Sequence, residues 1–161
     1  MLIEIARIFA AAAIAGILFV TVDLIFRLPE KGGVSGATSI GTAIEKGGGA
    51  LHGGYMMGNI VCSPDASAGT LLAACGVSIA GIPGGLAAAV LVFIGNRICH
   101  DPGYAGTSGA VLATCVVYGA SFAGFAPQDF IAGMVLAILS VQGISHARSS
   151  AFLDRLWGWR T

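Results

Sequence analysis

Residues 67–93 read SAGTLLAACGVSIAGIPGGLAAAVLVF and contain no Asp, Glu, Lys, Arg or His. An α-helix rises about 1.5 Å per residue, so about 20 apolar residues cross the roughly 30 Å of hydrocarbon in a bilayer. This run is therefore long enough to cross a membrane. The sequence GIPGG at 81–85 predicts a kink or break near mid-membrane, because proline removes a helical hydrogen bond and clashes with the preceding turn.

Four further segments have the length and apolar character of membrane helices. With the run above, extended to residue 95, they predict an all-α integral membrane protein with about five transmembrane helices in a single domain, residues 1–161. In the tail, Phe and Trp are interspersed with Arg, which is typical of a short helix lying in the membrane interface. The predicted spans cover residues 2–26, 38–62, 67–95, 106–126 and 129–147, and the interfacial tail covers residues 148–161.

The composition favours a lipid environment. Hydrophobic residues make up 56% of the chain and charged residues 10%, whereas a soluble domain has about a quarter charged residues. The formal net charge is zero and the basic residues form no patch, which excludes a nucleic-acid partner. The first apolar run is interpreted as a retained helix and not a signal peptide, because Glu4 precedes Arg7 and no small-residue cleavage site follows.

Glycine and proline mark the places where helices are expected to break or to pack closely in the second and third segments. A broken helix is tolerable in lipid only where protein or a water-filled cavity covers the break. Glycines spaced as G-x-x-x-G let helix backbones approach each other, which also predicts packing against other subunits. The candidate residues are Gly47, Gly48, Gly49, Gly53, Gly54, Gly81, Pro83, Gly84 and Gly85.

Loop charges predict the orientation, because short cytoplasmic loops collect Lys and Arg. With five spans, Arg7 lies alone on one side. The other side collects Arg27, Lys31, Arg97, Arg148, Arg155 and Arg160. This predicts an outside amino terminus and a cytoplasmic carboxyl terminus. If residues 32–62 formed a re-entrant loop instead, the asymmetry would weaken.

Ionisable groups inside a membrane are costly, so each becomes a functional candidate unless it reaches the interface. Asp23 lies near the cytoplasmic end of the first span, where a salt bridge to Arg27 or snorkelling is the alternative to an ion-path role. Glu45 and Lys46 directly precede the glycine break, where helix ends and freed carbonyls can hold a cation. Both groups would lie in cytoplasmic water if the segment begins later.

Two further polar residues follow on the second segment. His52 and Asn59 are seven residues apart and so lie near one face of a helix. A polar stripe lining a cavity is one interpretation. Hydrogen bonding to neighbouring helices is the other.

No residue pattern indicates catalysis by this chain alone. The sequence contains no nucleophile motif and no P-loop lysine motif. The cysteines are far apart without a C-x-x-C pair, and His100 and His146 fall in or beside cytoplasmic loops, which argues against a bis-histidine haem. We therefore expect no cofactor and no metal, with the chemistry carried out by a partner.

One stretch of the sequence resembles a known family. Pro29-x-x-Gly32-Gly33 followed by Ala37-Thr38-x-x-Gly41-Thr42 is similar to the Gly-rich stretch after the first helix in the D-type membrane subunit of the sodium-pumping tetrahydromethanopterin S-methyltransferase of methanogenic archaea. Gly95-Asn96 and Gly106-Thr107-x-Gly109 match in the same order. That subunit is longer, so a shorter relative in another methanogen complex, such as a small membrane subunit of an energy-converting nickel-iron hydrogenase, is the second possibility.

Either resemblance implies the same physical role. The chain would be a non-catalytic ion-path or scaffold subunit that couples a partner's chemistry to Na⁺ or H⁺ movement, surrounded by lipid and other membrane subunits. The alternative hypothesis is a self-sufficient small transporter or channel that forms its pore as a homo-oligomer. A purely structural assembly subunit is a third.

Overall fold

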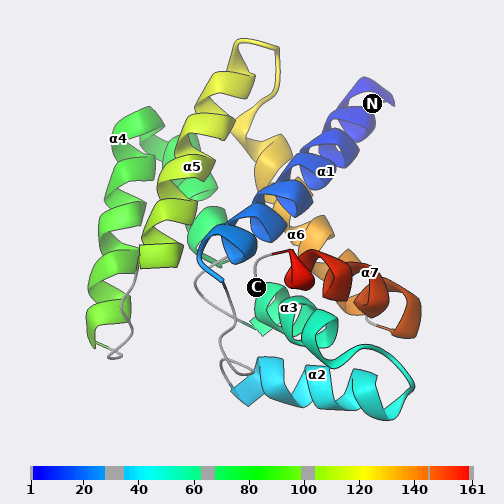
Figure 1. The fold of residues 1–161 in the computed structure, drawn as a ribbon. Coiled ribbons are helices and arrows are strands. Elements are labelled where there is room, and N and C mark those ends of the chain that lie inside the picture. Colours follow the sequence, from blue (N-terminus) through cyan, green and yellow to red (C-terminus); the bar gives the residue numbers. More distant parts are fainter. Residues whose placement is uncertain (1, 28–34, 63–67, 99–103, 145, 160–161) are drawn as a thin grey trace. The chain divides into compact units, whose positions relative to one another are not determined.

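The computed structural model describes residues 2–27, 35–62, 68–98, 104–144 and 146–159, and the described parts are entirely helical (Figure 1). The all-α prediction is therefore confirmed. The helices are α1 (Leu2–Ile25), α2 (Ser35–Lys46), α3 (Leu51–Cys62), α4 (Gly69–Ile98), α5 (Tyr104–Ser121), α6 (Pro127–Gly143) and α7 (Ala147–Gly158).

The chain divides into two compact units. Unit 1 consists of Met1–Phe19 and Pro64–Ala137, and unit 2 consists of Val20–Ser63 and Ile138–Thr161. The first therefore holds most of α1 together with α4, α5 and the beginning of α6. The second holds the end of α1, the pair α2 and α3, the end of α6, and α7.

In unit 1, α4 is two helical arms that reverse direction. The backbone leaves the helical region at Ala80 and at Gly81, where φ is 62° and ψ is −148°. A Cβ placed on Gly76 would lie 2.6 Å from the carbonyl carbon of Gly84. Eight residues in a straight helix would separate these positions by about 12 Å. The kink predicted around 81–85 is thus a complete reversal, with arms 69–79 and 82–98.

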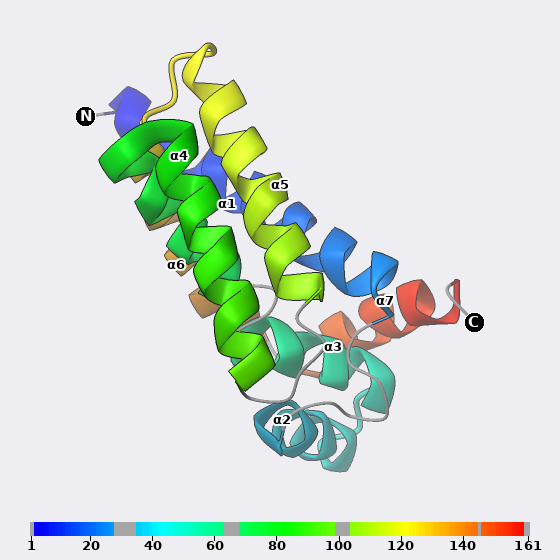
Figure 2. The same cartoon turned by 90° about the vertical axis from the view of Figure 1, so that its left-hand side faces the viewer.

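The arms of α4 contact each other and α5 through small residues. A Cβ on Gly85 would lie 2.8 Å from Val77 of the first arm and would overlap Thr114 of α5. Pro83 lies in the first turn of the second arm, where its missing N–H costs no helical hydrogen bond. Figure 2 shows α5 alongside the second arm. Glycine thus permits backbone contact on both sides of the reversal.

Helices α1 and α6 run in the same direction within unit 1. A Cβ on Gly133 would lie 2.7 Å from the backbone nitrogen of Ala12, and one on Gly124, before α6, would lie 3.4 Å from the guanidinium of Arg7. Helix α6 begins at Pro127, and the backbone N–H of Ala126 donates to Asp129 Oδ2 at 2.8 Å. Such first-turn capping fixes where the helix starts.

In unit 2, α2 and α3 form an antiparallel hairpin. Helix α2 ends because Gly48 has φ of +84°, and the N–H of Gly49 donates to the carbonyl of Ile44 at 2.9 Å, as in a Schellman cap. The exposed Gly47 lies in the same turn. A Cβ on Gly54 would lie 2.9 Å from Gly41 Cα, so the two backbones touch.

Helix α7 packs on the beginning of α3. A Cβ on Gly53 would overlap the carbonyl oxygen of Ser150 and lie 2.7 Å from its carbonyl carbon. Ser150 Oγ accepts the backbone N–H of Ala50 at 2.9 Å, and a Cβ on Gly49 would lie 3.0 Å from Ala147 Cα. One buried apolar cluster of unit 2 contains Ile44, Met56, Met57 and Leu153.

The five predicted spans are not reproduced one for one. By length and composition, the candidate spans among the described helices are α1 and α4, or three if α6 and α7 count as one bent span. The reversal divides α4 into two arms, so its 30 residues do not form one straight span. The predicted span 38–62 is instead the α2–α3 hairpin of two 12-residue helices. Composition marks the glycine break correctly but carries no information on whether the chain continues or turns back.

Replacing Gly53 by Ala should destabilise unit 2, because the new methyl group would overlap the backbone of α7. Overpacking of this kind costs about 1–3 kcal/mol. Thermal unfolding of the detergent-solubilised chain, followed by circular dichroism, measures the effect. The control is Gly16→Ala in α1, where nothing lies within 4 Å and alanine raises helix propensity. Equal melting temperatures for the two variants would contradict the close α3–α7 contact.

Candidate ion-path site

A buried polar pair joins α1 and α3 in unit 2. Asn59 Nδ2 donates a hydrogen bond to Asp23 Oδ1 at 2.9 Å. Asp23 has 0% of its surface exposed and Asn59 4%. The residues are 36 positions apart in the sequence, so the fold brings together two of the predicted ion-path candidates.

The carboxyl group of Asp23 lies in the interior of unit 2. Its sequence neighbours are also removed from the surface, since Val22 is buried and Leu24 is half-buried. The Asp23 side chain is therefore buried and does not reach towards water. Arg27, the salt-bridge partner considered from the sequence, is exposed just after the end of α1, where its φ is 55°. Burying an ionisable group in an apolar interior costs several kcal/mol unless it is hydrogen-bonded, so a buried carboxyl in a membrane protein is by default a hypothesis of a functional site.

Glu45 and Lys46 do not share this buried position. They are the last two residues of α2, and both are exposed. Helix α2 ends directly after them in the turn at Gly47 and Gly48. Of the two interpretations that the sequence left open, this placement favours solvated groups at a helix end over cation ligands inside a membrane span.

His52 faces α7 and not Asp23. Its ring stacks on the Trp157 indole, with ring centroids 4.9 Å apart and planes 18° apart. Its Nδ1 lies 3.4 Å from Asp154 Oδ1, and both side chains are about half exposed. The predicted polar stripe is therefore divided: His52 joins α3 to α7, while Asn59 joins α3 to α1.

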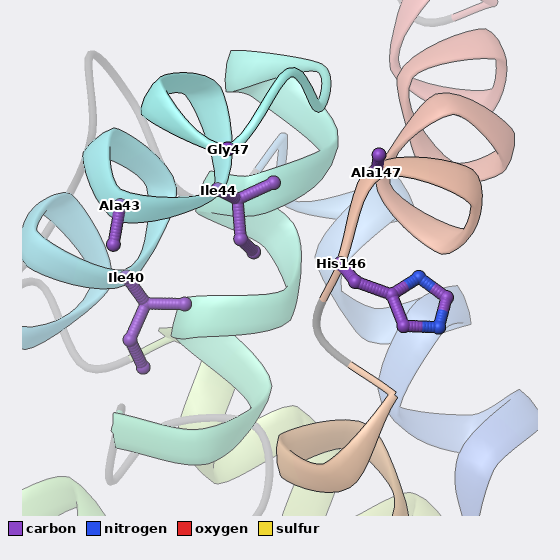
Figure 3. A pocket seen from close by; sticks show the side chains of 6 residues that line it. All are labelled: Ile40, Ala43, Ile44, Gly47, His146 and Ala147. Atoms are coloured by element: carbon purple, nitrogen blue, oxygen red, sulfur yellow. The ribbon is translucent and has the colours of Figure 1, made fainter.

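A small open hollow lies beside the hairpin, between the end of α2 and the start of α7 (Figure 3). Its volume is about 280 Å³. The Ile44 side chain points towards it, whereas the imidazole of His146 points away. The lining is mainly apolar, which suits packing better than chemistry. The lining residues are Ile40, Ala43, Ile44, Gly47, His146 and Ala147.

A family model described as EhaB-like matches residues 4–160. The chain belongs to the EhaB-like family. EhaB is a membrane-bound hydrogenase subunit of methanogens. The match agrees with the hydrogenase setting expected from the sequence, and nothing in it supports the methyltransferase resemblance. No curated protein and no solved structure matches the chain.

The apolar helices and the family together identify this EhaB-like chain as a membrane protein. Within the described residues, no three His, Cys, Asp or Glu side chains lie close enough to hold a metal ion. The Asp23–Asn59 pair combines a fully buried carboxyl group with a side-chain amide donor, and it is the candidate ion-path site of this EhaB-like chain. It can hold a charge or a proton at one carboxyl oxygen while an amide donor stays fixed beside it.

Sequence reasoning missed the contribution of α7 to this region. Asp154 and Ser150 bind α3 through a side-chain pair and a backbone contact, and neither was a candidate. The predicted amphipathic tail contained the signal, because Ser150, Asp154 and Trp157 recur at helical spacing. The sequence does not indicate which residues α7 contacts, because these lie about a hundred residues earlier in the chain.

Replacing Asn59 by Ala should destabilise the EhaB-like chain by about 1–3 kcal/mol, the usual cost of removing the hydrogen-bond partner of a buried polar group. Thermal unfolding in detergent measures this effect. The matched control is Gln128→Ala, which removes the exposed 3.0 Å hydrogen bond to Ser78 Oγ and should cost about 0.5 kcal/mol or less. If Gln128→Ala lowers the stability as much as Asn59→Ala does, burial does not strengthen the contribution of the Asp23–Asn59 hydrogen bond.

Proposed function

We propose that this chain is a non-catalytic membrane subunit of a multi-subunit energy-converting hydrogenase complex, and that Asp23 lies on a path for Na⁺ or H⁺. The family match supports the hydrogenase setting. The ion-path role rests on one observation, the fully buried Asp23 carboxyl with Asn59 as its hydrogen-bond donor.

The proposed role of Asp23 follows from the cost of its burial. Stability alone favours an apolar residue at such a position, because a buried polar pair seldom exceeds well-packed hydrophobic side chains in net stabilisation. A carboxyl that is retained there can take up and release a cation as its partner complex changes state. The Asn59 amide keeps the carboxyl oriented while its charge changes.

The proposal includes partner subunits, because the backbone at the break in α4 must be shielded from lipid. The first arm of α4, 69–79, is about 16 Å long at 1.5 Å per residue, which is about half of the hydrocarbon thickness. Backbone at such a reversal is tolerated within a membrane only when protein or a water-filled cavity surrounds it. Neighbouring subunits of the complex would supply that cover, and they would also carry the redox chemistry.

We propose that the chain crosses the membrane three times, an assignment that differs from the five spans that composition suggests. The passes are α1, α5 and α6. Helix α4 enters the bilayer from the cytoplasmic side as a re-entrant hairpin of its two arms, and the α2–α3 hairpin and α7 stay on the cytoplasmic side. Every basic residue except Arg7 then falls on the cytoplasmic side, as the positive-inside rule expects. This assignment keeps the amino terminus outside.

Subunit membership and the role of Asp23 are tested in one preparation. The tagged chain should co-purify with hydrogenase subunits in fixed stoichiometry from gently solubilised native membranes, as identified by mass spectrometry. Asp23→Asn, which keeps the shape but removes the charge, should leave the complex assembled. It should reduce ion uptake coupled to hydrogenase turnover in inverted vesicles by at least about tenfold, as loss of an essential proton-transfer group does.

The control for this experiment is Glu4→Gln, the same chemical change at an exposed position of the same helix. It should retain coupled ion uptake. Unchanged uptake in Asp23→Asn would remove the ion-path role and leave a scaffold. Recovery of the chain alone as a homo-oligomer would overturn the complex and favour a self-sufficient transporter.

The orientation predicts that green fluorescent protein fused after Thr161 fluoresces, because the reporter folds in the cytoplasm. Alkaline phosphatase inserted in the turn 122–126 should be active, because that turn lies outside. An active phosphatase fused after Thr161 would reverse the proposed orientation. Activity at both positions would exclude the proposed three passes.

A further inference from the structure

We propose that α7 carries a binding stripe for the anionic headgroups of phospholipids, formed by Arg148, Phe152, Arg155 and Trp159. This lipid-binding stripe is separate from the Asp23–Asn59 pair and does not depend on the hydrogenase role. All four side chains of the stripe are exposed in the described part of the chain.

The four residues of the lipid-binding stripe lie on one face of α7. Their spacings of four, three and four residues place them in a single row on a helix, and Trp159 keeps helical backbone angles at the C-cap. Phe152 is 61% exposed and Trp159 81%, and both arginines are exposed. Two guanidinium groups and two large aromatic rings therefore alternate along an open surface.

The opposite face of α7 holds the helix in place. Ser150 and Leu153 are buried there, and Ser150 Oγ accepts the backbone N–H of Ala50. The close contact of Gly53 with the backbone of Ser150 fixes the rotation of α7 about its own axis. The lipid-binding stripe is thus presented in a fixed orientation, which lowers the entropy lost when a ligand binds.

Charge and shape on the lipid-binding stripe match a phosphate headgroup. Arginine is weakly hydrated and offers paired N–H donors to phosphate oxygens. Trp and Phe prefer the depth of the headgroups, where an apolar ring and a polar surface meet. Asp154, the acidic residue within α7, lies on the side of the helix that faces His52, with its Oδ1 3.4 Å from His52 Nδ1.

The position of α7 in the chain favours lipid over an acidic protein as the occupant. Helix α7 starts at Ala147, directly after the apolar helix α6 ends at Gly143. An amphipathic helix that emerges next to a membrane helix lies at headgroup depth. Basic residues near an anionic membrane surface each strengthen binding, and this contribution weakens as salt screens the charges.

The test uses the full-length chain in lipid vesicles with Trp159 as the reporter. Trp157→Phe leaves Trp159 as the single tryptophan, since the chain has two. Half-maximal quenching should occur at a lower mole fraction of brominated phosphatidylglycerol than of brominated phosphatidylcholine. Each of the two arginines should lower this mole fraction by about fivefold. Arg148→Gln with Arg155→Gln, in the same background, should abolish this preference.

Two further variants separate charge from general disruption. Arg148→Lys with Arg155→Lys keeps the charge and should keep most of the preference, and Arg97→Gln, at an exposed arginine of α4, should keep all of it. Equal half-maximal mole fractions for the two lipids, or a preference that survives the double Gln variant, would overturn the proposal. Absence of quenching by either lipid would also overturn it and would favour an acidic protein partner.

Discussion

Direct contact between helix backbones is the interaction on which the rest of this structure depends. In lipid there is little hydrophobic drive between helices, so close packing and hydrogen bonding must hold them together. Within α4 the backbones touch at Gly76 and Gly84, and a contact just as close joins Gly53 of α3 to Ser150 of α7. Each of these contacts requires the absence of a side chain. The glycine content is therefore a condition of the fold and not a sign of flexibility.

The buried polar pair also depends on this packing. Helix α3 is held by α2 through Gly54 and Gly58 and by α7 through Gly53, which places Asn59 against Asp23 with little freedom to move. A fixed amide donor lowers the cost of keeping a carboxyl group away from water. Stability and the proposed ion path therefore rest on the same set of small residues.

The sequence contains the positions of the breaks but not their consequences. The predicted kink within 81–85 and the predicted break at 47–49 both coincide with residues where the backbone leaves the helix, because glycine and proline act locally. Whether the chain then bends or reverses depends on contacts such as Gly76 with Gly84, which no periodicity encodes. The pairing of Asp23 with Asn59 could not be predicted from the sequence for the same reason. Each polar residue in an apolar segment indicates that it needs a partner but not which residue that partner is.

The reversal at Ala80 and Gly81 has a consequence for the biogenesis of the protein. The first arm of α4 is too short to be retained in a bilayer as an independent segment, and its unpaired end groups would be exposed to lipid if it entered alone. On the proposed membrane assignment, the two arms leave the insertion machinery together, as one hairpin whose contacts form before lipid surrounds it. Translation would thus have to proceed beyond Ile98 before the earlier half of α4 is stable in the membrane.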